Sequence, residues 1–362
     1  MIFLLLTTIV AAEFIINSNN LSTWGSRFIT GKKYHFALSE HFDHPCGISC
    51  WSTTSTCGVW KHKKDIPISK WEFVGHITIN DNIPFCHDFA LTLESNSTHN
   101  VLMGYVTPKI HKITKIMSMA DFGPLSNKKC KNDIIPFDNK NYLRYTWLIY
   151  KVLNKNTPID VQIDNIFLNP KNQFTWLDIT NKLPPRYRGI PFVNPQPLID
   201  SRTGYGTLIN NKRYSLHRTI GTRKGKTDEI LVILSADKFI FEENSFYQEV
   251  KRINNIGLRE DGWFETNGKT FTIIYHDLQL CRIRHNCGAI IYSDDLINWT
   301  NPKILYQSIM TDFGQLYYRQ RPSIFRTKNE TYLCTASAIK SAGYINNKCN
   351  GGSRTYCIET KL

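Results

Sequence analysis

Two strand-like segments decide the fold: residues 265–277 (ETNGKTFTIIYHD) and residues 288–299 (GAIIYSDDLINW). Each contains a short run of apolar and β-branched residues, as strands do. The Asn267-Gly268 dipeptide before the first run is a turn former, and Ser293-Asp294-Asp295 ends the second run with residues that favour turns. The stretch therefore predicts an antiparallel pair of strands.

The same unit recurs along the chain, with a polar turn, an apolar strand, a loop and a second strand that ends in a polar residue, Asp, and then an aromatic residue or Pro. Further copies cover residues 31–39 with 58–77, 96–106 with 113–124, 210–219 with 229–239, and 321–337. Repetition of one antiparallel unit predicts an all-β fold, a β-propeller. A pair of β-sandwiches is the alternative, because such hairpins occur in any β fold. The only helix expected is a short one near residues 248–256.

The repeats also predict where the blades end. Their closing residues are expected on the outer strands, at Trp71, Pro124, Phe239 and Trp299. The chain has 362 residues and contains no low-complexity linker, so residues 13–362 are expected to form a single domain.

Residues 1–12 (MIFLLLTTIVAA) form an uncharged apolar run that ends in small residues. This pattern is typical of a cleavable signal peptide, with cleavage expected after Ala11 or Ala12, and the run is too short to span a bilayer as a helix. No later segment reaches transmembrane length. The alternative is a buried N-terminal strand. The sequence thus predicts a secreted, extracellular protein.

The ten cysteines and four N-x-S/T sequons agree with export. No pair forms a CxxC motif, and His41 and His44 beside Cys46 fit no standard metal spacing, so no metal or cofactor is expected. The expected disulfides are Cys281–Cys287, Cys349–Cys357 and Cys86–Cys130, with the other pairings open. The expected glycosylation sites are Asn20, Asn96, Asn298 and Asn329.

The chain is basic, with 44 Lys and Arg against 30 Asp and Glu and a net charge of +14. A surplus spread along the chain favours an anionic partner such as an acidic glycan or a cell surface. The alternative is a merely basic, solvated surface. Export argues against nucleic acid, and a monomer is expected.

Four short motifs carry a resemblance to a known group of proteins. They are Asn194-Pro195-Gln196-Pro197, the acidic pair Glu260-Asp261 before Gly262, the strand ending Ser293–Trp299, and Arg319-Gln320-Arg321-Pro322. In this order they resemble the blade motifs of the five-bladed propellers of glycoside hydrolase families 43 and 32. The resemblance runs from about Trp24 to Ser337 and implies a five-bladed β-propeller that acts on carbohydrate.

Glycoside hydrolysis uses one carboxyl group to protonate the leaving oxygen and another as nucleophile or base. Propellers place such acids where the inner strands begin. Glu260 is expected to be the general acid, with its pKa raised by burial and by Asp261 beside it. Asp88 and Asp164, each expected to open an earlier strand, are candidates for the base and a transition-state stabiliser. The alternative is that isolated acids cap turns.

Three further residues are candidates for substrate binding. His276 could bind a sugar hydroxyl or orient a carboxylate, although a backbone partner would also satisfy it. Arg321 could pair with Glu260 or bind a substrate carboxylate, or it could hold the last blade in place through a salt bridge. Trp263, with Trp51 and Trp176, could stack on a sugar ring, although core packing is the commoner role.

No first-blade acid clearly matches the one that those hydrolases use, so three functions stay open. The first is a secreted glycoside hydrolase, and the second is a non-catalytic propeller that binds glycan or a host surface. The third is a basic extracellular interaction protein without a carbohydrate role. A complete set of acids in one funnel favours the first, and an aromatic funnel with fewer than two acids favours the second. A funnel filled by its own side chains favours the third.

Overall fold

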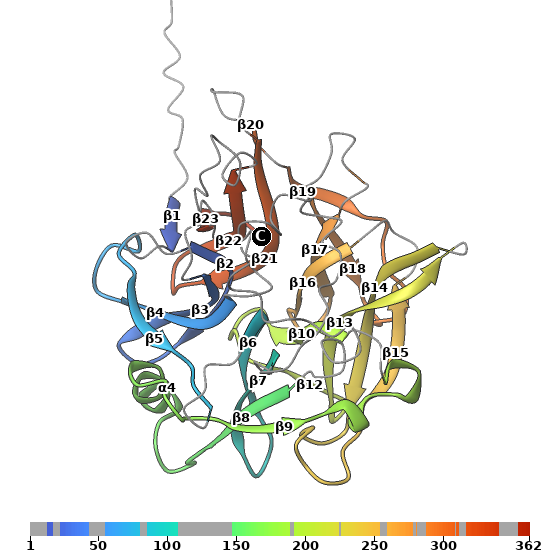
Figure 1. Cartoon of the computed structure of the whole chain (residues 1–362), viewed down its shortest axis with the longest axis horizontal. Coiled ribbons are helices and arrows are strands. Elements are labelled where there is room, and N and C mark those ends of the chain that lie inside the picture. Colours follow the sequence, from blue (N-terminus) through green and yellow to red (C-terminus); the bar gives the residue numbers. More distant parts are fainter. Residues whose placement is uncertain are drawn as a thin grey trace, which may run out of the picture.

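Short antiparallel strands make up most of the protein, and they form five blades around a central axis (Figure 1). The computed structural model describes residues 13–16, 22–42, 55–79, 85–107, 147–188, 192–223, 226–253, 259–277, 280, 287–307, 309–310, 316–339 and 354–362. The radial arrangement confirms the predicted five-bladed propeller and excludes the two β-sandwiches.

Each blade has four main strands, numbered from the axis outward. Blade 1 contains β2 (Ser22–Thr30), β3 (Tyr34–Phe42), β4 (Ser55–Lys63) and β5 (Glu72–His76). Blade 2 contains β6 (Phe85–Ser95), β7 (Asn100–Thr107), β8 (Trp147–Leu153) and β9 (Thr175–Asp178). Blade 3 contains β10 (Phe192–Pro197), β13 (Lys212–Arg223), β14 (Lys226–Ala236) and β15 (Gln248–Ile253). Blade 4 contains β16 (Arg259–Thr266), β17 (Phe271–Asp277), β18 (Cys287–Ser293) and β19 (Lys303–Gln307).

Blade 5 joins the two ends of the chain. Its strands are β21 (Leu316–Arg326), β22 (Thr331–Ile339), β23 (Arg354–Glu359) and, outermost, β1 (Glu13–Ile16). Strand β1 pairs antiparallel with β23, from Glu13 opposite Ile358 to Ile16 opposite Thr355. Three short strands complete the sheets: β11 (Ile199–Asp200) along β16, β12 (Leu208–Ile209) on β13, and β20 (Ile309–Met310) on β21. The ring is thus closed by the first strand of the chain.

The decisive stretch forms β17 and β18, and its turns explain why. Gly268 adopts a φ of +89°, which a glycine tolerates, and Asn267 Oδ1 accepts the backbone N–H of Thr270 at 2.9 Å. After β18, the Asp295 carboxylate accepts the backbone N–H groups of Asn298 and Ile297 at 2.7 and 2.8 Å, and these hydrogen bonds lower the pKa of Asp295. Asp295 therefore fixes the turn before the outermost strand.

One apolar cluster fills each of the five interfaces between neighbouring blades. For example, Val101 and Leu148 of blade 2 share a cluster with Val232 and Leu234 of blade 3. The other four clusters join blades 1 and 2, 3 and 4, 4 and 5, and 5 and 1. Because each blade is covered on both faces, its middle strands read as nearly continuous apolar runs, as β17 and β18 do.

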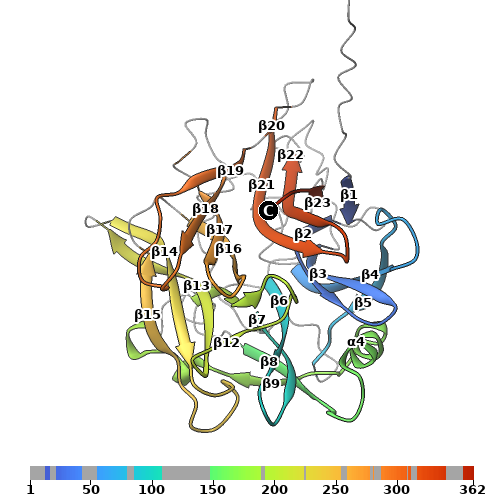
Figure 2. The same ribbon diagram turned by 180° about the vertical axis from the view of Figure 1, so that it is seen from behind.

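The structure corrects the predicted helix. Residues 248–253 form the outer strand β15, which pairs with β14. The α-helix that the described residues contain is α4 (Ile159–Leu168), at the edge of the molecule in both views (Figures 1 and 2), where Ile163, Ile166 and Phe167 are buried against blades 1 and 2. Two 3-10 turns, Thr180–Lys182 and Pro185–Tyr187, follow β9. No helix in these described segments is long and apolar enough to cross a membrane.

Two predicted disulfides are wrong. Cys86 is bonded to Cys57, which links β6 to β4 and so ties blade 2 to blade 1. Cys357 is bonded to Cys334, its direct neighbour across β22 and β23. Cys287 is also disulfide-bonded, whereas Cys281, Cys130 and Cys349 lie outside the described residues, so the Cys281–Cys287 bond stays a prediction.

The residues that were predicted to lie on the outermost strands lie one strand earlier. Phe239 and Trp299 lie after the third strands β14 and β18, and Trp71 directly precedes β5. The outermost strand follows each of these residues, so the repeated motif closes the third strand. Pro124 lies outside the described residues.

Candidate functional site at the axis

The innermost strands of all five blades carry extra residues, which shift their register against the second strands. The shifts lie at Trp24/Ser26 in β2, Phe85/Ala90 in β6, Val193/Gln196 in β10, Glu260/Gly262 in β16 and Gln320/Ser323 in β21. Each lies in the first half of its strand or close to its middle. Such bulges bend a strand and re-aim its side chains, and they are common beside active sites.

The sequence motifs coincide with these bulges. Asn194 and Pro195 lie within the shift in β10, Asp261 is the extra residue in β16, and Arg321 and Pro322 lie within the shift in β21. The acidic candidate Asp88 lies within the irregular stretch of β6. Three of the four motifs that carry the resemblance therefore lie where the inner strands are distorted, whereas the fourth, Ser293–Trp299, ends the third strand β18.

Arg27 of β2 shows that four of the bulges meet at one level around the axis. Its buried guanidinium donates to Gln196 Oε1 at 3.0 Å, to the carbonyl oxygen of Pro322 at 3.1 Å and to that of Gly262 at 3.1 Å. These partners belong to the bulges of blades 3, 5 and 4. Arg27 also lies 5.7 Å from the centre of the Trp263 ring. One side chain of blade 1 thus connects three other blades across the axis.

Arg321 forms the salt bridge that was its structural alternative. Its Nη1 lies 2.6 Å from Glu40 Oε1 of β3, and both side chains are buried. Arg321 has a φ of +49° and passes so close to Gly25 that a Cβ there would lie 2.7 Å from Arg321 Cδ. The Gly25 bulge therefore leaves room for an ion pair that joins blade 5 to blade 1. No sequence motif points to Glu40 as the partner.

For the three candidate acids of the inner strands, the structure describes only the backbone. Asp88 belongs to β6, and Glu260 and Asp261 belong to the start of β16, where Glu260 lies opposite His276. Their side chains lie outside what the structure describes. Because Asp261 is the extra residue of a bulge, simple alternation no longer requires Glu260 and Asp261 to face opposite ways. Blade 3 separates the strand of Asp88 from that of Glu260.

Asp164 does not open a strand. It lies in the middle of helix α4, and its buried carboxylate accepts the backbone N–H of Lys33 at 2.8 Å. The helix lies at the outer edge of the propeller (Figure 1), away from the other candidates. The prediction that Asp164 opens a strand is wrong, and its turn-capping alternative describes it better.

The aromatic and histidine candidates lie in different places. His276 is fully buried in β17, in register with both Glu260 and Gly288. Trp263 is 4% exposed, and its Nε1 donates to Glu265 Oε2 at 2.8 Å. Trp176 lies on the outer strand β9 of blade 2. Trp51 lies outside the described residues.

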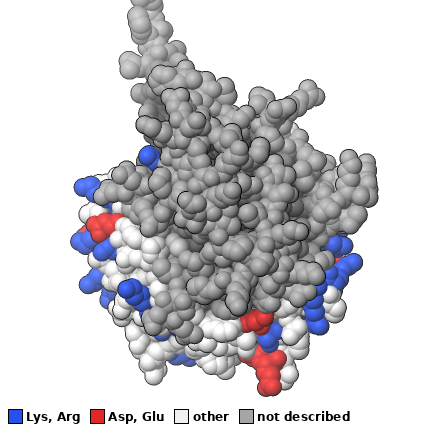
Figure 3. Space-filling view, viewed as in Figure 1, with Lys and Arg blue, Asp and Glu red and all other residues white. Residues whose placement is uncertain are grey.

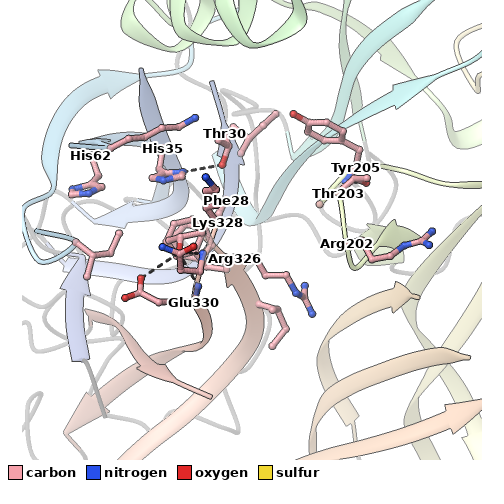
Figure 4. A pocket seen from close by; sticks show the side chains of 18 of the residues that line it. Phe28, Thr30, His35, His62, Arg202, Thr203, Tyr205, Arg326, Lys328 and Glu330 are labelled. Atoms are coloured by element: carbon pink, nitrogen blue, oxygen red, sulfur yellow. Dashed lines mark hydrogen bonds between the residues drawn. The ribbon is translucent and has the colours of Figure 1, made fainter. Parts of the chain in front are cut away.

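The opposite end of the axis, where the inner strands β2 and β21 end, holds a cavity of about 800 Å³ (Figure 4). We call this cavity the lower pocket. Phe28 and Phe325 line it from the inner strands, Lys64 and Arg202 from loops, and Trp263 from β16. A void of about 10 Å³ beside Arg27 and Gln196 continues toward the centre. This void is about the size of one water molecule. The lower pocket is therefore separated from the end of the axis where the inner strands begin.

The basic side chains are distributed over the described surface as the sequence indicated. On the face shown in Figure 3, Lys and Arg side chains are spread around the described margin and do not gather in one block. Among the described residues, no cluster of three or more His, Cys, Asp or Glu side chains could hold a metal ion.

No family model and no curated protein sequence matches the chain. Solved structures do match. One described as a glycoside hydrolase has a TM-score of 0.56 at 8% identity, over 98% of this chain and 92% of the other. An endo-arabinase from Bacteroides thetaiotaomicron has a TM-score of 0.50 at 11% identity, over 94% and 95%. An exo-β-1,3-galactanase from Phanerochaete chrysosporium, with β-1,3-galactotriose, has a TM-score of 0.53 at 9% identity, over 97% and 64%.

These comparisons confirm the resemblance at the level of the fold. The chain has the five-bladed propeller found in glycoside hydrolases of family 43 and related groups. At identities near a tenth, the likeness says nothing about which residues act or on what substrate.

Proposed function

We propose that the protein is a secreted, carbohydrate-active propeller that binds a glycan at the end of the axis where the inner strands begin. The observation that carries this proposal is the coincidence of the motif acids with the inner-strand bulges. A bulge places an irregular, re-aimed side chain at the centre of an otherwise rigid ring, which is what a carbohydrate site on a propeller requires.

The reaction we propose is hydrolysis of a glycosidic bond by two carboxyl groups. Glu260 or Asp261 of blade 4 protonates the leaving oxygen, and Asp88 of blade 2 acts as nucleophile or as the base for a water molecule. His276, which is buried and lies opposite Glu260 in the strand register, orients the acid. The distance between the two carboxyl groups decides whether the product retains or inverts its configuration.

A set of amide variants tests this assignment. Glu260→Gln, Asp261→Asn and Asp88→Asn are compared with wild type for reducing-sugar release from arabinan, galactan and pectic oligosaccharides. Loss of a catalytic carboxyl group is expected to lower turnover by about two to four orders of magnitude with little change in melting temperature. Asp164→Asn is the matched control, because its carboxylate lies in α4, and it should keep full turnover. Full activity in all three inner-strand variants would refute the catalytic assignment.

The second candidate is a glycan-binding propeller without turnover. It is favoured by the pairing of Glu40 with Arg321, because this buried acid of blade 1 is bound in an interblade ion pair. The hydrolases that the sequence resembles use an acid of the first blade, and an ion-paired Glu40 would not serve as one. Binding of oligosaccharides by wild type without release of reducing sugar from any of them would favour this candidate over the enzyme.

Export is part of the proposal. Cleavage near Ala12 would leave β1, which begins at Glu13, at the start of the mature chain. Asn96, Asn298 and Asn329 lie in turns, with Asn298 and Asn329 exposed, where a glycan would fit. N-terminal sequencing of the secreted protein and a mass shift on enzymatic deglycosylation test both points. A full-length chain with its first residues intact and no glycan would contradict them.

A further inference from the structure

We infer that the lower pocket is a second binding site, and that its ligand is an anionic oligosaccharide, sulfated or carboxylated. The pocket lies at the opposite end of the axis from the proposed site, and its volume of about 800 Å³ is large enough for several sugar rings. This site does not depend on the catalytic residues proposed above.

The pocket is formed by three blades and the loop between β11 and β12. The end of β2 and the β4–β5 loop contribute from blade 1, and the turn between β21 and β22 contributes from blade 5. Trp263 reaches it from blade 4, and the loop 202–205 reaches it from the β11–β12 connection. In Figure 4, Arg202 and Tyr205 lie on one side of the opening, and His35 and His62 lie on the other. A ligand in the pocket would therefore contact several blades at once.

Positive charge predominates on the pocket lining. Lys64, Arg202, Arg326 and Lys328 line it, against the single acid Glu330. Just outside the lining, Glu265 binds Arg326 through two hydrogen bonds of 2.9 Å, and Asp200 pairs with Arg202 at 2.8 Å. The Lys64 and Lys328 side chains are exposed on the wall. A sulfate or carboxylate group would place negative charge between lysines from blades 1 and 5.

His35 does not add charge to the pocket but provides a polar group. Burial, with the nearby Lys64 and His62, lowers the pKa of His35 to about 3, so its ring is neutral at physiological pH. His35 Nδ1 shares a hydrogen bond of 2.9 Å with Thr30 Oγ1. His35 therefore contributes no charge to anion recognition, which falls chiefly to Lys64 and Lys328.

Aromatic surfaces favour a sugar over a simple anion. Phe28 stacks on the buried Phe325 with ring centres 4.5 Å apart, and Phe28 and Tyr205 are the partly exposed aromatic residues of the lining. Sugar rings pack on aromatic faces, whereas an inorganic anion gains nothing from them. The combination of cations and aromatic rings thus points to a charged saccharide.

Arg27 and its partners at the centre of the ring make the lower pocket independent of the proposed site at the other end of the axis. Arg27, held by Gln196 and two backbone carbonyl groups, lies beside the void of about 10 Å³, which is too small for a sugar ring. A glycan chain cannot pass through it. Ligands at the two ends therefore enter from opposite faces of the propeller.

Titration calorimetry with three probes tests the inference: a sulfated heparin hexasaccharide, an oligogalacturonate and a neutral arabino-oligosaccharide. The first two distinguish sulfate from carboxylate recognition, and at least one should bind with an affinity that falls as salt is raised. The double variant Lys64→Gln with Lys328→Gln should bind that probe about tenfold more weakly, the size expected for losing two exposed ion pairs. The protein is deglycosylated first, because the sequon Asn329 lies on the rim.

A control variant separates the pocket from general electrostatics. Lys238→Gln with Lys303→Gln removes the same net charge from exposed positions elsewhere and should leave the affinity unchanged. Equal weakening by both double variants, or no binding of either anionic probe, would overturn the inference. Glu260→Gln should keep the affinity, and the pocket variant should keep any hydrolytic turnover. Failure of the second binding site can therefore be told apart from failure of the proposed catalytic site.

Discussion

Replacing Arg27 with methionine tests whether the ring is held together at its centre. The substitution keeps an unbranched, flexible side chain but removes the donors to Gln196 Oε1 and to the carbonyl oxygens of Gly262 and Pro322. A buried acceptor left without a donor costs about 1 to 3 kcal/mol, so three of them give about 3 to 9 kcal/mol. Methionine saves the several kcal/mol spent on burying the arginine charge. We expect a net loss of about 3 kcal/mol in the free energy of unfolding.

Chemical denaturation followed by tryptophan fluorescence measures this loss. Arg188→Met is the matched control, because Arg188 also donates to two carbonyl oxygens, those of Leu183 and Asn181, at 3.0 and 2.9 Å, but at an exposed position. Water replaces those donors, so the control should lose less than about 1 kcal/mol. An equal, small loss in both variants would refute the view that Arg27 links the blades.

Two further predictions concern the same core. Gly25→Ala should lower the free energy of unfolding by about 2 kcal/mol or more, because a φ of +67° and a Cβ only 2.7 Å from Arg321 Cδ are both unfavourable. The control Gly204→Ala, with a φ of +72° and open space around it, should lower it by about 1 kcal/mol. Equal losses of the two variants in denaturation would contradict the clash with Arg321. Burial lowers the pKa of His217 to about 3. Between pH 6.5 and pH 3 the unfolded chain therefore binds a proton that the folded chain does not, so the free energy of unfolding falls as the pH falls. Denaturation at pH 6.5 and at pH 5 should show a loss of up to about 2 kcal/mol, which the variant His217→Gln should lack.

The blades could be predicted because their signals are local. The strand 271–277 and the turn at Asp295 depend on residues close in sequence, and both formed as the pattern indicated. Segment 248–253 was predicted as helix but became an edge strand, since pairing with β14 outweighs its weak local preference. Helix α4 was missed because its sequence, IDVQIDNIFL, is short and rich in β-branched residues.

The contacts at the axis could not be predicted, because they join residues far apart in the chain. Nothing near Cys57 indicates that Cys86 in the next blade is its partner. Arg27 reads as an ordinary polar residue of a strand, although Gly25 inside that strand was a usable signal for a bulge. The motif at Asn194–Pro197 coincides with the bulge of β10, but the role of its Gln196 depends on Arg27 of blade 1, which donates a hydrogen bond to it.

The pairing of β1 with β23 has a consequence for biosynthesis. Strand β1 emerges from the ribosome long before its partner β23, and Thr23 and Ser26 likewise gain their partner Thr355 only when β23 is made. Until then Ile16 lacks the core of blade 5 in which it is finally buried. The nascent chain must therefore carry an unpaired β1 while blades 1 to 4 are synthesised, and unpaired edges invite intermolecular pairing. Chaperones that shield extended apolar segments would matter most for this protein before β23 is made.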